Sequence, residues 1–149
     1  MKNFALGFML ITLLTACGPM NSEKATNADF PHTEKISKNA MSTQNNLFLV
    51  HMIPQGQNST AGLEVGDNNY LIHGVRADNL SSLSDQAKIT ISYWMPDMPT
   101  MGKSDAVAIR QNDGSYEVTL FYSMTGKWEI TVTIQDGSKQ DNYVFETNL

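Results

Sequence analysis

From Leu47 onward the chain is a series of short apolar segments separated by turn-forming residues. Lys88–Met95, Tyr116–Tyr122 and Trp128–Ile134 alternate apolar and polar residues, which is the period of a half-buried β-strand. Turn signals such as Asn112-Asp113-Gly114 separate the segments, which recur at spacings of roughly 8–15 residues. No segment here has a convincing helical period. Residues 47–149 are therefore predicted to form one all-β domain, an immunoglobulin-like antiparallel β-sandwich of about seven strands.

The strand pattern also predicts which side chains fill the space between the two sheets. Apolar residues that recur with period two should face inward, and about 100 residues can bury such a core without a disulfide. We expect the core to contain Phe48, Val50, Leu71, Ile89, Ile91, Tyr93, Val118, Leu120, Trp128, Ile130, Val132 and Ile134.

The beginning of the chain has the pattern of an export signal. Lys2 precedes an apolar run of about 11 residues, which is too short for a transmembrane helix of roughly 20. The run closes on Leu14-Thr15-Ala16-Cys17, which resembles the lipobox of bacterial lipoproteins. The resemblance implies that residues 1–16 are a signal peptide and that Cys17 is lipidated and anchors the protein to a membrane. The alternative is a secreted protein whose cysteine falls there by chance.

Residues 17–46 separate this signal from the predicted domain. They are rich in Asn, Ser, Thr, Lys and Glu, and neither the strand period nor the helix period persists in them. Such a composition predicts a flexible linker between the lipid and the domain, with His32 as a solvated linker residue.

The charge and the cysteine content exclude several kinds of partner and site. The formal net charge is −5, from 10 basic and 15 acidic residues, whereas nucleic-acid binding requires a basic patch. Attraction to anionic lipid also requires basic residues, so membrane contact is expected through the lipid anchor alone. Because Cys17 is the single cysteine, the domain offers no disulfide, thiol nucleophile or cysteine-based zinc site.

The most unusual segment directly follows a predicted strand and reads Trp94-Met95-Pro96-Asp97-Met98-Pro99-Thr100-Met101-Gly102. Its two prolines indicate a loop or a sheet edge. Three methionines spaced three residues apart on a stiff loop can converge on one side, and a fourth, Met124, follows another predicted strand. Thioether sulfur is a soft ligand that selects Cu(I) over hard cations.

These residues form a candidate copper site. The predicted ligands are four methionines, with one of two strand histidines as a further ligand: Met95, Met98, Met101, Met124, His51 and His73. The alternative is packing, because methionine fills irregular gaps in cores and contacts aromatic rings. In that case Met95 closes the end of the sandwich beside Trp94, and both histidines are ordinary strand residues.

Four separated motifs resemble the YtkA-like/FixH-like domain, in which a Trp-Met-Pro-x-Met loop precedes Gly-x-Tyr and Met-x-Gly-x-Trp. Here the three motifs are Trp94–Met98, Gly114–Tyr116 and Met124–Trp128, and Leu63–Tyr70 is similar to the family's first strand with Val-Gly-x-Asn. The match spans roughly residues 47–147. It implies a β-sandwich, and a link to copper handling and to the assembly of respiratory oxidases.

The chain departs from the family pattern at one position. Family loops often carry a histidine after the second methionine, whereas Pro99-Thr100-Met101 stands here. This departure disfavours a histidine-assisted Cu(II) site and favours an all-thioether Cu(I) site.

The chain lacks the motifs of common enzymes. A nucleophile elbow, a phosphate-binding glycine loop and a His-Glu-x-x-His helix are absent from the sequence, and Asp97 and Asp105 read as solvated loop carboxylates. Two functions remain. One is a lipoprotein of the cell envelope, facing the periplasm or the exterior, which binds Cu(I) or delivers it to a copper or respiratory-oxidase assembly protein. The other is a metal-free interaction module that uses the Met-Pro loop as an apolar contact.

Overall fold

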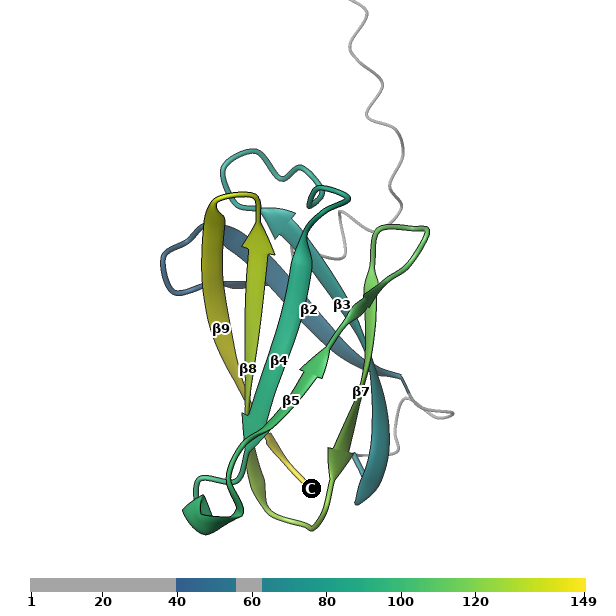
Figure 1. Ribbon diagram of the computed structural model, residues 1–149, viewed down its shortest axis with the longest axis vertical. Helices are drawn as coiled ribbons and strands as arrows, with labels where there is room; N and C mark the ends of the chain where they lie inside the picture. Colours follow the sequence, from purple (N-terminus) through teal and green to yellow (C-terminus); the bar gives the residue numbers. More distant parts are fainter. Residues whose placement is uncertain (1–39, 56–62) are drawn as a thin grey trace, which may run out of the picture. The chain divides into compact units, whose positions relative to one another are not determined.

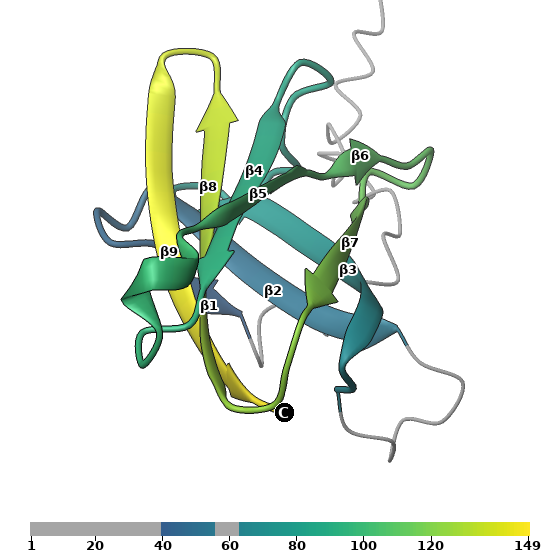
Figure 2. The same cartoon turned by 60° about the horizontal axis from the view of Figure 1, so that its bottom comes forward.

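The computed structural model describes residues 40–55 and 63–149, and these residues form two antiparallel sheets. Figures 1 and 2 show the two sheets as the layers of a sandwich. One sheet has the order β1 (Met41–Ser42), β2 (Phe48–Gln55), β3 (Gly66–Arg76), β7 (Tyr116–Tyr122) and β6 (Ile109–Arg110). The other has the order β5 (Ser104–Val107), β4 (Lys88–Trp94), β8 (Lys127–Asp136) and β9 (Lys139–Asn148). The predicted antiparallel β-sandwich is therefore confirmed.

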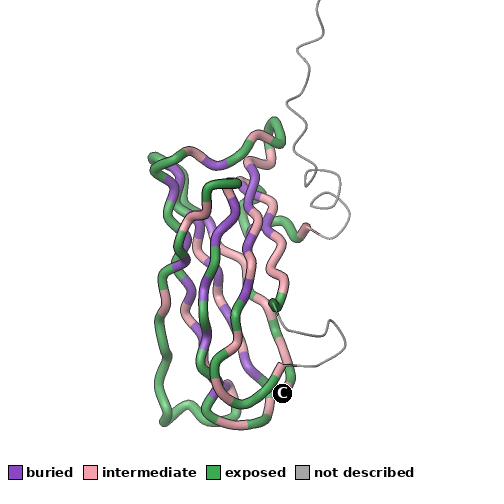
Figure 3. Tube along the Cα trace, turned by 90° about the vertical axis from the view of Figure 1, so that its right-hand side faces the viewer, coloured by how far each residue is buried: buried purple, intermediate pink, exposed green. Residues whose placement is uncertain are grey.

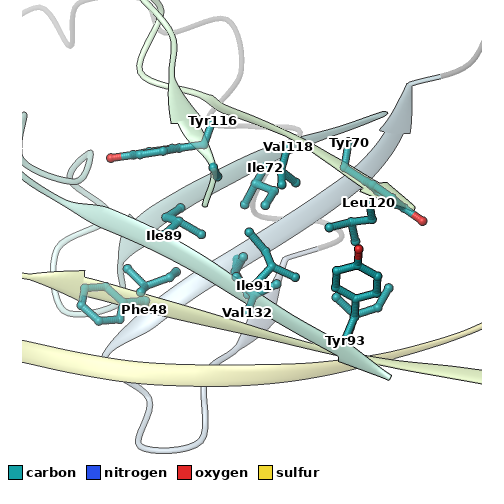
Figure 4. Close-up of a cluster of buried hydrophobic side chains, with 14 of the residues drawn as sticks. Phe48, Tyr70, Ile72, Ile89, Ile91, Tyr93, Tyr116, Val118, Leu120 and Val132 are labelled. Carbon is teal, nitrogen blue, oxygen red and sulfur yellow. The ribbon is translucent and has the colours of Figure 1, made fainter. Parts of the chain in front are cut away.

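The alternation of the sequence is the alternation of burial in the structure. Along β7 every second residue from Tyr116 to Tyr122 is buried, and along β8 the same holds from Trp128 to Asp136. Figure 3 shows this as buried and exposed segments that alternate along the chain, and Figure 4 shows side chains from both sheets meeting in the core. The core residues include Phe48, Val50, Ile89, Ile91, Tyr93, Val118, Leu120, Trp128, Ile130, Val132 and Ile134.

Leu71 is the one predicted core residue that the structure places differently. Its neighbours Tyr70 and Ile72 are buried, and Leu71 lies half-exposed on the other face of β3. In the run Tyr70-Leu71-Ile72 all three residues are apolar, so the period of two does not show which of them face inward. The segment Leu63–Tyr70, which resembles the family's first strand, enters β3 only from Gly66.

The sandwich begins before residue 47, the predicted start of the domain. β1 pairs with β2, with Met41 opposite Val50 and Ser42 opposite Leu49. The following turn is fixed by Asp141 of β9, which accepts hydrogen bonds from the Thr43 hydroxyl at 2.6 Å and from the Asn45 backbone N–H at 2.9 Å. Residues 41–46, assigned to the linker from their polar composition, thus pack into the domain.

The segment after η1 (Pro99–Met101) crosses from one sheet to the other. β5 pairs with β4, whereas β6 pairs with β7 in the opposite layer. Ala108 between them is buried, and its N–H donates to the Ile89 carbonyl at 3.0 Å. This crossing joins the two sheets along one side of the sandwich (Figure 2).

Several predictions concern residues outside the described part of the chain. They are the signal peptide at 1–16, the lipidated Cys17, most of the linker and His32. Within residues 40–55 and 63–149, no helix has the length and apolar character needed to cross a bilayer.

Candidate metal centre

The loop between β4 and β5, residues 95–103, consists of two consecutive turns. The Met98 N–H donates to the Met95 carbonyl at 3.0 Å, and the Met101 N–H donates to the Met98 carbonyl at 3.0 Å. The second turn leads through the short 3₁₀ helix η1. The loop lies at the end of the sandwich where β4, β7 and β9 end, and we call this end the methionine end (Figure 1).

Met98 and Met101 present exposed side chains at the methionine end. Their exposed fractions are 39% and 48%. Met98 precedes η1 as its N-cap and Met101 ends it, so both exposed thioethers belong to one tight turn.

Met95 is placed differently, because its side chain is only 5% exposed and belongs to the core. Its position corrects the expectation of a partly exposed thioether there. The cause is visible in the sequence, since Ile91, Tyr93 and Met95 share one phase of the strand period. A Cβ atom added at Gly126 would lie 2.6 Å from Met95 Cε, so Met95 packs against the backbone of the β7–β8 loop.

The β7–β8 loop, residues 123–126, carries Met124 to the same end. Met124 is half-buried and packs against the core, and its carbonyl accepts a hydrogen bond from Trp128 Nε1 at 3.2 Å. Gly126 exchanges two backbone hydrogen bonds with Leu149, of 3.2 and 3.1 Å. These bonds fix the position of the β7–β8 loop next to Met95.

An aromatic cluster lies beneath these methionines. The ring of Tyr122 is 6.0 Å from that of Tyr93 and 5.0 Å from that of Trp128, both in edge-to-face orientation. The hydroxyls of Tyr70 and Tyr122 are 2.7 Å apart. Burial, and then the bond to Tyr70, raise the pKa of Tyr122, so it stays protonated and offers no phenolate to a metal.

Two contacts fix the ends of the methionine loop, and the sequence analysis did not find them. Trp94 Nε1 donates to Glu129 Oε1 at 2.9 Å across β4 and β8. On the other side of the loop, Lys103 Nζ lies 4.9 Å from the centre of the Trp94 ring, a cation–π distance. Both contacts depend on strand register, which no short motif encodes.

His51 and His73 do not lie beside the methionine loop. They are opposite each other on β2 and β3, which belong to the other sheet. Gly66 pairs with Tyr122 at the methionine end, and His73 is seven residues farther along β3, a distance of about 23 Å at the rise of a strand. Because β2 and β3 carry them away from the methionine end, both histidines lie too far from the methionines to share a site with them.

The donors at the methionine end are those that suit a soft ion. Within the described residues, no group of three or more His, Cys, Asp or Glu side chains is placed to hold a metal ion. Thioethers prefer Cu(I) over zinc or hard cations. The arrangement offers Met98 and Met101 at the surface, with Met124 partly buried at the same end.

Comparison with known proteins gives the family. The YtkA-like family model matches residues 57–133. No curated protein matches the sequence. Among solved structures, FetP of uropathogenic Escherichia coli strain F11, expressed in the periplasm of E. coli, superposes with a TM-score of 0.47 at 12% identity, over 74% of this chain and 91% of FetP. A copper-bound FetP variant gives 0.46 at 12% identity, over 73% and 92% of the two chains. Because the family model matches more than half of its 149 residues, this chain belongs to the YtkA-like family.

Proposed function

We propose that this YtkA-like protein is an extracytoplasmic module that binds Cu(I) through the thioethers of Met98 and Met101. The observation that supports this most directly is the exposure of both side chains on one tight turn, which the Met101 N–H closes by donating to the Met98 carbonyl. Exposed apolar side chains raise the free energy of the protein in water, and a soft ligand role accounts for two thioethers placed together at the surface.

Met124 is the third proposed ligand. Cu(I) accepts low coordination numbers, so two surface thioethers and one thioether from the neighbouring loop are a sufficient set. Met124 is partly buried against the core, and such apolar surroundings would limit access of water to the ion. Met95 then supports the site from the core and is not itself a ligand.

An anaerobic Cu(I) titration against a chromophoric competitor tests this proposal. The protein is the full chain with Cys17→Ser, so that its single thiol cannot bind Cu(I). We expect binding by the parent and loss of affinity when Met98→Leu and Met101→Leu are combined. The exchange keeps side-chain volume, so the free energy of unfolding should change by less than about 1.5 kcal/mol. Because thioethers do not titrate, affinity should persist down to about pH 5.

Met41→Leu is the matched control for that titration. Met41 is 47% exposed, which is close to the value for Met101, but it lies on β1, where Tyr143 donates to its sulfur. The control should bind Cu(I) like the parent. Equal affinity in the parent and in the double variant would contradict the proposal, as would a parent that does not bind Cu(I).

The second candidate is a protein-binding surface without metal. The exposed Met98, Pro99 and Met101 also form an apolar contact of the kind that adapts to a partner. In that case Cu(I) does not bind, and the Leu substitutions, which preserve apolar area, leave partner binding largely intact. The Cu(I) titration therefore separates the two functions.

The setting of the proposed function follows from the family resemblance and the chain's beginning. Lipid attachment at Cys17 in the cell envelope, and delivery of copper to a respiratory-oxidase assembly protein, remain proposals. A binding role fits the site better than catalysis, because its proposed ligands are thioethers, which neither accept nor donate protons near neutral pH.

A further inference from the structure

The two histidines of the sandwich form a pair of their own. His51 on β2 is the direct cross-strand partner of His73 on β3. Directly opposed side chains project from the same face of a sheet, with Cβ atoms about 4.5–5.5 Å apart. The residues that flank His51 along β2, Val50 and Met52, point the other way, toward the core, so the two imidazoles share the outer face of the five-stranded sheet.

The ladder between β2 and β3 continues on either side of this pair. The next rows of the ladder are Leu49 opposite Val75 and Ile53 opposite Leu71. β3 is paired on its other side with β7 up to Ile72, and both strands appear side by side in Figures 1 and 2. The two backbones thus have little freedom to separate, and the rings need only side-chain rotations to bring one nitrogen each toward a common point.

Imidazole nitrogens bind transition metals at about 2.0–2.1 Å. Two such ligands in adjacent coordination positions need nitrogen atoms about 3 Å apart, which the Cβ spacing of a cross-strand pair allows. Among divalent ions, Cu²⁺ binds a given nitrogen site most tightly. A two-imidazole site would be completed by water on this partly exposed face.

The surroundings keep the histidines suitable as ligands. Both side chains are only partly buried, so a metal ion can reach them from solvent. Asp113, in the turn between β6 and β7, accepts hydrogen bonds from the N–H and the hydroxyl of Ser115 and interacts electrostatically with His73. A carboxylate near a ligating histidine orients the ring and strengthens it as a donor.

We propose that His51 and His73 form a cross-strand imidazole pair that binds Cu²⁺ on the outer face of the five-stranded sheet. This site is separate from the thioethers of Met98 and Met101. Those lie in the loop between β4 and β5 of the four-stranded sheet, at the methionine end, whereas His73 is seven residues along β3 from Gly66 at that end. It does not depend on whether those thioethers bind Cu(I). The molecule then carries two copper sites with different ligand chemistry, a soft one for Cu(I) and an imidazole one for Cu²⁺.

Titration with Cu²⁺ followed by electron paramagnetic resonance tests the pair. The parent is the full chain with Cys17→Ser and His32→Gln, which leaves His51 and His73 as its only histidines. We expect one Cu²⁺ per chain and nitrogen hyperfine coupling from two imidazoles. His51→Gln or His73→Gln should each weaken binding by about 100-fold, because the second imidazole no longer closes a chelate.

Two further measurements separate ligation from folding. The melting temperature of the metal-free single variants should stay within a few degrees of the parent, since both histidines are only partly buried. Cu²⁺ should raise the melting temperature of the parent more than that of either variant. The combined Met98→Leu and Met101→Leu variant should bind Cu²⁺ like the parent. The proposal is overturned if either histidine variant retains the parent's affinity, or if fewer than two imidazole nitrogens couple to the copper.

Discussion

The two ends of the sandwich are closed by opposite chemistry. At the end formed by the β8–β9 turn, which we call the hairpin end, Asp136 and Asp141 are buried carboxylates saturated with hydrogen bonds. At the methionine end, the closing groups are the thioether of Met95 and aromatic rings, and two further thioethers remain exposed. Polar groups that are fully paired fix one end, whereas adaptable apolar groups close the other and leave donors available for a ligand.

The hairpin end is organised around its two carboxylates. Asp136 Oδ2 accepts bonds from Arg76 Nε at 2.8 Å and Nη2 at 2.7 Å, and Asp136 Oδ1 accepts one from the Ser84 hydroxyl at 2.5 Å. Asp141 fixes the turn after β1 through Thr43 and Asn45. Burial alone would raise the pKa of both carboxyl groups, but the hydrogen bonds outweigh it and hold each pKa below its usual value.

The largest expected effect is at the methionine end. Trp128 is 4% exposed and contacts Tyr93 and Tyr122, so Trp128→Ala should lower the free energy of unfolding by about 3–5 kcal/mol. Thr131→Ala and Thr133→Ala, on the opposite face of β8, are the controls and should have small effects. Urea unfolding curves give the comparison. A Trp128→Ala variant as stable as the controls would mean that the aromatic cluster does not close this end.

The second effect is at the hairpin end and depends on pH. Asp141→Asn removes the charge that the Thr43 hydroxyl and three backbone N–H groups bind, and should cost about 1.5–3 kcal/mol at pH 7. The folded pKa is below the unfolded value of about 3.9. The stabilisation by the charge is therefore complete above pH 4 to 5 and declines as pH falls through the folded pKa.

Unfolding free energies of the parent and Asp141→Asn, measured from pH 7 to pH 2, should accordingly converge in acid. A gap between them that stays constant over this range would show that the carboxylate charge does not fix the turn after β1.

The smallest effect compares one glycine at each end. Gly126 has φ +133° and faces Met95 Cε, whereas Gly137 in the β8–β9 turn has φ +63° and open space around it. Gly126→Ala should cost about 1–2 kcal/mol from backbone strain and displacement of Met95, and Gly137→Ala should cost less. Thermal unfolding of the two variants measures the difference. Equal costs would indicate that contact with Met95 contributes nothing at the methionine end.

Local alternation was sufficient to predict most of the fold. Along most of β4, β7 and β8 polar and apolar residues alternate, so strand position and inward face could both be read from the sequence. The period of two loses this information where consecutive residues are all apolar, and for that reason Leu71 was assigned to the wrong face. The period of two also gives no information about residues 41–46, because their position depends on Asp141, almost 100 residues later in the chain.

The candidate site could be predicted only in part, because local sequence patterns do not encode contacts between distant segments. The spacing of Met98 and Met101 is local, and both lie exposed on one tight turn. Met95 was in phase with Ile91 and Tyr93, so its burial could have been recognised from the strand period. The placement of His51 and His73 depends on strand direction and sheet order, which the sequence does not encode in any short segment.

The unequal lengths of the sheet edges bear on solubility. β1 and β6 at the edges of one sheet have two residues each, and β5 has four, whereas β9 at the remaining edge has ten. Long edge strands can pair with another molecule and start aggregation, and charged side chains counter this. β9 carries Lys139 and Glu146, which are exposed and paired with Asp78 and Lys127. Their contribution is therefore to keep neighbouring molecules apart when the protein is crowded, more than to hold the fold together.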